Sequence, residues 1–278
     1  MPELPEVETI RAHLAASVTG RRFARVQILD SRLTRPADPD AVARELQGER
    51  VQQVRRRGKY VVFVFESGRH LLVHLRMTGT FGHDSSGRAG ADPYRRAVVS
   101  LDDGSDVIYR DVRRFGTWHL LEPSELEPYW DGRLGVEPLE PEFTARHLAD
   151  ALAGRRAPIK AAVLDQRTVA GVGNIYADEA LWRARLHPLR PSGSLTFSEV
   201  SRLRRAVRSA LEAGIAHQGA TLRDYRAPDG ATGTMQDKFK VYGRTGEPCD
   251  RCGIAIEKAR VAGRGTWYCP RCQALRAP

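Results

Sequence analysis

The 278-residue chain contains no long apolar run. Its apolar stretches fall well short of the roughly 18 residues that a membrane span requires. The first dozen residues include Glu3, Glu6, Glu8 and Arg11, where a signal peptide would need an apolar segment. Internal repeats and low-complexity tracts are also missing. We therefore expect a soluble, cytoplasmic globular protein that makes no contact with a membrane.

Cysteine is scarce, and all of it lies near the C-terminus. The spacing C-x2-C-x16-C-x2-C is typical of a four-thiolate zinc ribbon. Two disulfides are disfavoured in an intracellular chain, and a redox pair is disfavoured by the presence of two such motifs. Four thiolates leave no position for water, and the HExxH motif is missing, so a hydrolytic zinc is not expected. The sequence predicts one structural zinc ion, whose binding folds the short module, held by Cys249, Cys252, Cys269 and Cys272.

Acidic side chains are scarce in the second half of the chain. Residues 1–140 carry 21 basic and 21 acidic side chains, whereas residues 141–278 carry 23 basic and 13 acidic ones. The whole net charge of +10 thus lies in the second half, which indicates a polyanionic partner. Only five of the 44 basic residues are Lys, so an arginine-favouring genome is the alternative explanation.

The pattern of the chain changes twice. Leu4, Val7, Leu14 and Val18 predict a helix over residues 4–18, and six or more short strands up to about residue 130 predict a sandwich or barrel-like sheet. A Pro-containing linker and several amphipathic helices follow, then a polar loop at 224–237 and a short β-rich tail. We expect an α+β multidomain fold with a domain at 1–133, a linker at 134–143, a helical domain at 144–236 and a zinc module at 237–278.

Proline at position 2 allows removal of the initiator Met, which would leave Pro2 with a free secondary amine. An α-amino group ordinarily has a pKa of about 7.7–8.0, so a useful fraction is neutral and nucleophilic at pH 7. With an aldehyde carbon it forms an iminium, which is an electron sink for elimination, and Glu3 and Glu6 could shuttle protons. The alternative is that these carboxylates only complement the dipole of the first helix.

Several motifs together resemble the bacterial formamidopyrimidine-DNA glycosylases. They occur in the expected order as MPELPEVET, RRGKY, HLRMTG, DVRRFG, LDQRTVAGVGNIYADEAL, KVYGRTGEPC and the zinc ribbon. The LPE after Glu3 is similar to this branch rather than to the related endonuclease VIII branch. The resemblance implies an N-terminal β-sandwich with flanking helices, a helix–two-turn–helix domain and a zinc-ribbon β-hairpin. It also implies a monomer that holds damaged double-stranded DNA in a basic cleft.

The resemblance implies a glycosylase that removes oxidised or ring-opened purines such as 8-oxoguanine. The same enzyme would then cleave the strand by β- and δ-elimination. Pro2 would be the nucleophile, Glu3 the acid that assists ring opening, and Glu6 its support. Lys59 would be the catalytic-site lysine, contacting a phosphate near the lesion. The same likeness assigns phosphate contacts to His74, Asn174, Tyr242 and Arg264, with Arg264 also part of the catalytic set. It assigns the filling of the gap left by the everted base to Met77, Arg113 and Phe115.

One segment departs from the family's pattern. Thr234 and Met235 stand before the VYGR strand, where the loop that caps the lesion usually has aromatic character. This departure concerns the choice between 8-oxoguanine and ring-opened purines rather than the strand chemistry. The alternative function is a non-catalytic damaged-DNA-binding protein on the same scaffold, although the intact Pro2, Glu3 and Lys59 disfavour it.

Overall fold

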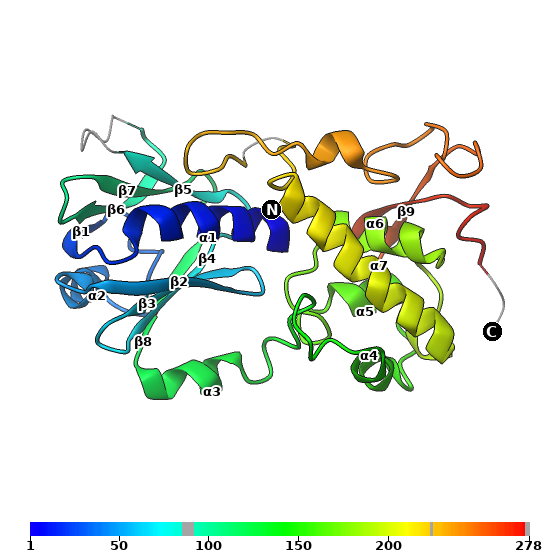
Figure 1. Cartoon of the computed structure of the whole chain (residues 1–278), viewed down its shortest axis with the longest axis horizontal. Coiled ribbons are helices and arrows are strands. Elements are labelled where there is room, and N and C mark those ends of the chain that lie inside the picture. Colours follow the sequence, from blue (N-terminus) through cyan, green and yellow to red (C-terminus); the bar gives the residue numbers. More distant parts are fainter. Residues whose placement is uncertain (85–91, 223–224, 276–278) are drawn as a thin grey trace. The chain divides into compact units, whose positions relative to one another are not determined.

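The computed structural model describes residues 1–84, 92–222 and 225–275, and its contacts divide the chain into two compact units (Figure 1). Unit 1 contains Met1–Asp131 and His217–Thr234, and unit 2 contains Gly132–Ala216 and Met235–Pro278. The segment expected to cap a lesion therefore groups with the N-terminal residues rather than with the helices that precede it in sequence.

Unit 1 is built on two four-stranded antiparallel sheets, which confirms the predicted β-sandwich. Strands are rich in Val, Ile and aromatic residues, the side chains that pack best on a pleated, half-buried surface. The first sheet has the order β1 (Phe23–Ile28), β6 (Arg95–Leu101), β7 (Asp106–Asp111) and β5 (Gly79–Asp84). The second has the order β2 (Val51–Arg57), β3 (Tyr60–Phe65), β4 (His70–His74) and β8 (Thr117–Leu121).

One apolar core joins both sheets to the first helix of unit 1. Helix α1 (Leu4–Val18) begins at residue 4 as its pattern predicts, and its buried side chains belong to the same cluster as those of the strands. Phe63 of β3 meets Phe81 of β5 edge-on, so aromatic rings from both sheets are in contact. Two short helices, α2 (Pro39–Leu46) and α3 (Leu126–Trp130), complete the unit.

In its described residues, unit 2 combines four α-helices with a β-hairpin, as expected for a helix–two-turn–helix domain followed by a zinc ribbon. Helix α6 packs along α7, whose buried residues recur at helical spacing. The hairpin turn at Ala262 and Gly263 has φ angles of +47° and +76°, the pattern of a tight two-residue turn. The elements are α4 (Ala145–Leu152), α5 (Ile159–Leu164), α6 (Asn174–Ala184), α7 (Phe197–Ala216), β9 (Glu257–Val261) and β10 (Arg264–Tyr268).

The polar loop expected at 224–237 begins at residue 224, outside the described residues. Its described part up to residue 234 contains no named helix or strand but is hydrogen-bonded to strand β5 of the same unit, from Thr80 Oγ1 to Arg226 O at 3.1 Å and from His83 N to Pro228 O at 3.3 Å. Met235 begins a short 3-10 helix (Met235–Lys238) and is fully buried, so packing occupies the side chain that we expected in the capping loop.

Across the described ranges, none of the helices has the length and apolarity needed to cross a membrane.

Candidate functional site

The first turn of α1 fixes the residues predicted to carry the chemistry. Glu3 is the N-cap residue of α1, and its backbone N–H donates to Glu6 Oε2 at 2.8 Å, which closes a capping box. Glu6 Oε1 accepts from the backbone N–H of Ala220 at 2.8 Å. Pro2, Glu3 and Glu6 are all buried. Glu6 thus ties the start of the helix to a segment more than 200 residues away in sequence.

Gly219 makes this close approach possible. Its φ of +78° is rarely adopted by other residues, and a Cβ at this position would lie 2.7 Å from Glu6 Cγ. A side chain at position 219 would therefore displace the carboxylate that holds Glu3.

Lys59 and His74 lie at the same end of the second sheet. Lys59 follows Gly58 in the turn from β2 to β3, and Tyr60 after it pairs with His74, the last residue of β4. Burial lowers the pKa of His74 to about 3, and the charges of Arg76 and Lys59 add to this effect. The Arg76 N–H donates to His74 Nδ1 at 2.9 Å, so the neutral ring carries its proton on Nε2. His74 is therefore a neutral hydrogen-bond donor.

Met77, Arg113 and Phe115 lie in two loops, one after β4 and one after β7. Phe115 is 52% exposed, and the Arg113 guanidinium lies over its ring at 4.8 Å from the centroid. Each loop also holds an arginine with positive φ, namely Arg76 at +54° and Arg114 at +59°. An exposed aromatic ring in a loop with such backbone angles has no role in the core, so Phe115 is available to another molecule.

Asp111 joins these two loops and was not identified from the sequence. Its carboxylate is 1% exposed and accepts from Thr78 Oγ1 at 2.5 Å, in the loop that carries Met77. It also accepts from the backbone N–H groups of Phe115 at 2.9 Å and Gly116 at 2.8 Å. The signal in the sequence is an aspartate directly before the VRRFG turn, since Asp commonly bonds the backbone of a following turn.

Three further predicted residues lie together in unit 2. Asn174 is the first residue of α6, and its Nδ2 donates to Gly265 O at 3.0 Å. Arg264, exposed at the start of β10, is the neighbour of Gly265. The ring of Tyr242 lies 4.5 Å from that of Trp267 on the same strand. The structure thus brings Asn174, Tyr242 and Arg264 around one hairpin.

Glu179 places Tyr242 and was also not identified from the sequence. It is fully buried in α6, and its Oε1 accepts from three consecutive backbone N–H groups, those of Lys240, Val241 and Tyr242, at 2.9, 2.9 and 3.1 Å. Arg183 donates to its other oxygen at 2.8 Å. A carboxylate with this many donors holds its segment rigidly.

A buried ion pair attaches the hairpin to the helices. Lys160 Nζ of α5 lies 2.8 Å from Asp178 Oδ1 of α6 and donates to Gly265 O at 2.9 Å and Thr266 Oγ1 at 2.8 Å. Asp178 Oδ2 accepts from Trp267 N–H at 3.0 Å. Burial raises the pKa of Asp178 to about 7, although the charge of Lys160 opposes this. Removing either partner would leave a buried charge uncompensated.

The four cysteines form the predicted metal site. Their sulfur atoms all lie within 4.8 Å of one another, a spacing that accommodates a tetrahedron with Zn–S bonds of about 2.3 Å. Burial opposes ionisation of Cys249, but a hydrogen bond from Trp182 Nε1 and backbone N–H donors lower its pKa to about 6. Because four thiolates close the coordination shell, this is the site of one structural zinc ion.

Three family models match the chain in sequence order. They are the formamidopyrimidine-DNA glycosylase N-terminal domain over residues 1–118, the H2TH domain of the same enzyme over 134–226, and the zinc finger found in FPG and IleRS over 246–275.

Curated relatives and solved structures agree with these matches. The formamidopyrimidine-DNA glycosylases of Symbiobacterium thermophilum and Roseiflexus sp. are 48% and 44% identical, covering 99% and 98% of this chain and 90% and 100% of theirs. A Lactococcus lactis FPG mutant bound to a Fapy-dG containing DNA superposes with a TM-score of 0.93 at 36% identity, covering 99% of this chain and 100% of that one. The Lactococcus lactis Fpg with an abasic site containing DNA gives 0.91 at 36% identity, covering 98% and 100%.

The order of β-sandwich, helix–two-turn–helix domain and four-thiolate zinc ribbon defines a class of enzyme, the zinc-ribbon DNA glycosylases. Within that class, the chain belongs to the formamidopyrimidine-DNA glycosylase family, and the expectation made from its motifs is confirmed.

Proposed function

We propose that this protein binds damaged double-stranded DNA as a monomer, excises oxidised or ring-opened purines and then cleaves the strand. Support comes from its relatives, which are named formamidopyrimidine-DNA glycosylases, and from similar structures that were solved with DNA containing Fapy-dG, 8-oxo-G or an abasic site. The excess positive charge of residues 141–278 suits a polyanionic substrate. Such a substrate would place the enzyme in the cytoplasm, at the nucleoid.

The chemistry is that of a secondary amine. After removal of Met1, the nitrogen of Pro2 attacks C1′ of the sugar, and the glycosidic bond breaks with its electron pair leaving on the base, which takes up the proton that the amine loses. Glu3 donates a proton to the ring oxygen as the sugar opens, which leaves an iminium on Pro2. Loss of a C2′ proton then expels the 3′ phosphate, a second elimination expels the 5′ phosphate, and water releases the amine. The iminium carries no N–H proton, so it keeps its charge and remains an electron sink.

The arrangement around Pro2 is the observation that carries this proposal. Pro2 is buried at the start of α1, beside the N-cap Glu3, whose backbone is held by Glu6. Complementing the helix dipole does not by itself require burial, whereas Glu3 and Glu6 are both buried. Glu6 acts here as a positioning residue, because both of its oxygens bind backbone N–H groups.

The other proposed site residues have two roles. Some contact phosphates, and the others form a wedge that fills the space left by the extruded base. We assign phosphate contacts near the lesion to Lys59, His74, Asn174, Tyr242 and Arg264, the last two lying on the hairpin side of unit 2. Met77, Arg113 and Phe115 would fill the space left by the extruded base, since lost stacking costs a few kcal/mol that an apolar wedge partly recovers.

We also assign a role to each part of the chain. Residues 1–133 would carry the chemistry, 134–143 would link, 144–236 would bind DNA and cap the lesion, and 237–278 would bind DNA through the zinc ribbon.

Borohydride trapping on a duplex with a single 8-oxoguanine tests the proposal. We expect a covalent adduct that peptide mapping places at Pro2, because borohydride reduces the iminium to a stable amine. Pro2→Gly should suppress base excision severely, with Arg205→Gln on the exposed face of α7 as a control that retains trapping. An adduct at Lys59, or none at all, would contradict the assigned nucleophile.

A further inference from the structure

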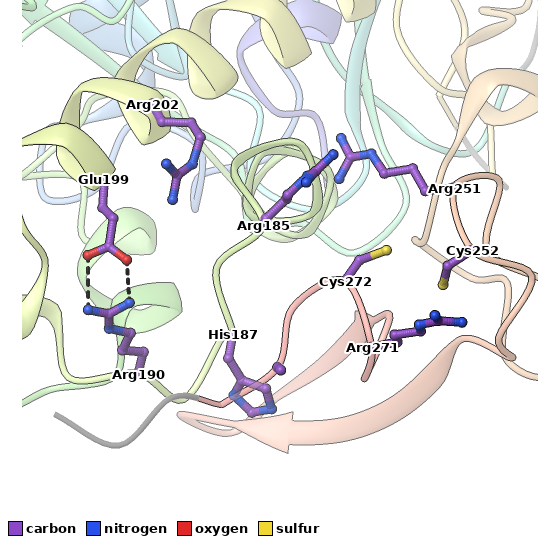
Figure 2. A pocket seen from close by; sticks show the side chains of 10 residues that line it. Arg185, His187, Arg190, Glu199, Arg202, Arg251, Cys252, Arg271 and Cys272 are labelled. Atoms are coloured by element: carbon purple, nitrogen blue, oxygen red, sulfur yellow. Dashed lines mark hydrogen bonds and ion pairs between the residues drawn. The ribbon is translucent and has the colours of Figure 1, made fainter.

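A cavity of about 850 Å³ lies in unit 2 at the C-terminal end of α6, beside the two cysteine knuckles (Figure 2). This volume is in the range of small-molecule sites. Its lining includes a single carboxylate, Glu199, but five arginines, namely Arg185, Arg190, Arg202, Arg251 and Arg271. The side chains proposed for DNA contacts or catalysis are not among those that line this cavity, which does include the zinc ligands Cys252 and Cys272.

Most of the positive charge in the cavity has no acidic partner. Arg190 forms two hydrogen bonds to Glu199, at 2.5 and 2.9 Å, which Figure 2 shows as dashed lines. Within residues 1–84, 92–222 and 225–275, the other four arginines form no ion pair with a carboxylate. A zinc ion with four thiolates carries a net charge of about −2. It offsets about half of the four positive charges, so a surplus of about +2 remains.

Two of the arginines are held in place by the end of α6. Arg202 Nε donates to Ala184 O at 2.7 Å, and Arg251 donates to Trp182 O at 2.7 Å while its guanidinium stacks 3.6 Å from the centroid of the Trp182 ring. Ala184 O lies in the last turn of α6, where carbonyl groups lack helical partners, and Trp182 O also accepts from the backbone N–H of Arg185 at 3.1 Å. Because each guanidinium has five N–H donors, both arginines retain donors for a ligand.

Arg185 and Arg271 have no such structural role. Their guanidinium groups donate no hydrogen bond to any residue that the structure describes. Arg185 adopts a φ of +55° at the C-cap of α6, and Figure 2 shows its guanidinium beside that of Arg251. Like charges gathered in a concave site relieve their repulsion when an anion binds.

The cavity lies away from the residues assigned to DNA in unit 2. Asn174 begins α6, and the cavity opens at the other end of this 11-residue helix. At 1.5 Å per residue, the two ends are about 16 Å apart. A ligand in the cavity would therefore not occupy the phosphate position proposed at Asn174.

We propose that this cavity is a second, previously unassigned site that binds a small free oligophosphate anion such as pyrophosphate. Arginine forks match phosphate oxygens in pairs, the surplus charge suits a ligand with two or more negative charges, and the volume suits a small molecule rather than a duplex. The proposal does not depend on the glycosylase reaction.

Calorimetric titration of the full-length, zinc-loaded protein with pyrophosphate at low salt tests the site. Arg185→Gln and Arg271→Gln should each weaken binding about tenfold or more, since each removes charge-assisted hydrogen bonds. Arg205→Gln removes the same charge from the exposed face of α7, outside the cavity, and should change the affinity less than twofold. Arg185 and Arg271 hold no part of the fold, so zinc content and melting temperature should stay unchanged.

Three results would overturn the proposal. The first is the absence of binding at millimolar pyrophosphate, or an equal loss in Arg205→Gln, which would indicate a nonspecific charge effect. The second is heat that accompanies the release of zinc, because this would be chelation. The third uses an undamaged duplex: if Arg185→Gln weakens duplex binding more than Arg205→Gln does, the occupant is a backbone phosphate rather than a free anion.

Discussion

Buried carboxylates place the functional side chains of this protein at the residue scale. Glu6 accepts from the N–H groups of Glu3 and Ala220, Asp111 from three N–H groups and a hydroxyl, and Glu179 from three N–H groups. Each lies directly beside residues proposed to meet DNA. Hydrogen bonds to a charged acceptor are stronger than neutral ones, so one buried carboxylate fixes several groups of backbone at once.

His74 gives a prediction at this scale. Its pKa is about 3 in the folded protein and about 6.5 in an unfolded chain. Below pH 6.5 the unfolded chain binds a proton on this imidazole that the folded protein does not bind. The free energy of unfolding therefore decreases as the pH is lowered. Through His74, the wild-type protein should lose about 2 kcal/mol of its free energy of unfolding between pH 7 and pH 5. The His74→Gln variant should not show this part of the loss. Urea unfolding at several pH values measures this, and parallel curves for the two proteins would contradict it.

At the scale of structural elements, loops and a hairpin carry the residues proposed to contact DNA. Buried side chains attach each of them to the neighbouring strands or helices. Asp111 joins the two wedge loops, and the Lys160–Asp178 pair joins β10 to α5 and α6. Such attachment keeps Phe115 and Arg264 exposed without leaving them free to collapse onto the surface. Function at these positions depends on the anchor as well as on the exposed residue.

Asp111→Asn should impair extrusion of the damaged base. The amide would present N–H donors to the N–H groups of Phe115 and Gly116 or to the hydroxyl of Thr78, at a cost of about 1–3 kcal/mol. We expect weaker binding and slower excision on duplex DNA, measured with a fluorescent base opposite the lesion. Cleavage of a single-stranded abasic oligonucleotide, which needs no wedge, should stay within a few-fold of wild type. An equal loss on both substrates would instead indicate that Asp111 supports the catalytic residues.

The capping segment should act on lesion choice. Deleting residues 230–232, which are exposed, should change the ratio of excision rates for 8-oxoguanine and formamidopyrimidine duplexes. Cleavage of a pre-formed abasic site should remain within a few-fold of wild type, because Pro2 and Glu3 are untouched. Single-turnover kinetics on the three substrates measures both quantities.

Met235→Ala is the matched comparison for that deletion. Because Met235 is fully buried, truncation of its side chain should lower the free energy of unfolding by about 2–5 kcal/mol. The ratio of excision rates for the two lesions should stay unchanged. A collapse of abasic-site cleavage in the deletion variant would show that the segment supports the catalytic geometry.

Unit 1 and the zinc ribbon of unit 2 differ in how they are stabilised, and this decides how the molecule responds to loss of the metal. Unit 1 has a large apolar core shared by both sheets and α1. The zinc ribbon has only a small cluster around its cysteines, with Trp182 and Val241. A core of that size cannot offset the entropy of ordering the ribbon, so the metal must supply much of its stability.

Removing zinc, by chelation or by Cys269→Ser, should therefore unfold the ribbon and abolish DNA binding. Arg264 loses its position when the hairpin unfolds, and Tyr242 loses the Trp267 ring that it packs against, whereas the sandwich keeps its core. Fluorescence anisotropy with a lesion duplex and circular dichroism of the β-sheet signal measure the two effects. Unchanged affinity in the zinc-free protein would show that the ribbon contributes only stability.

The sequence alone determined the features that depend on local pattern. Cysteine spacing gave the zinc site, helical spacing gave the helix at 4–18, strand patterns gave a sandwich or barrel-like sheet, and the order of motifs gave the family and with it the sandwich. Each of these is encoded within a few neighbouring residues, because helical and strand periods, turns and metal knuckles are short-range.

Tertiary structure decided which distant residues meet. The pairs Glu6–Ala220 and Asp111–Thr78 join residues far apart in sequence, and the arginine cavity gathers side chains from four separate segments. The exposure of Phe115 and the burial of Met235 likewise depend on what packs around them. A local pattern carries no information about such contacts, because hydrogen bonding and burial are set by distances that exist only in the folded chain.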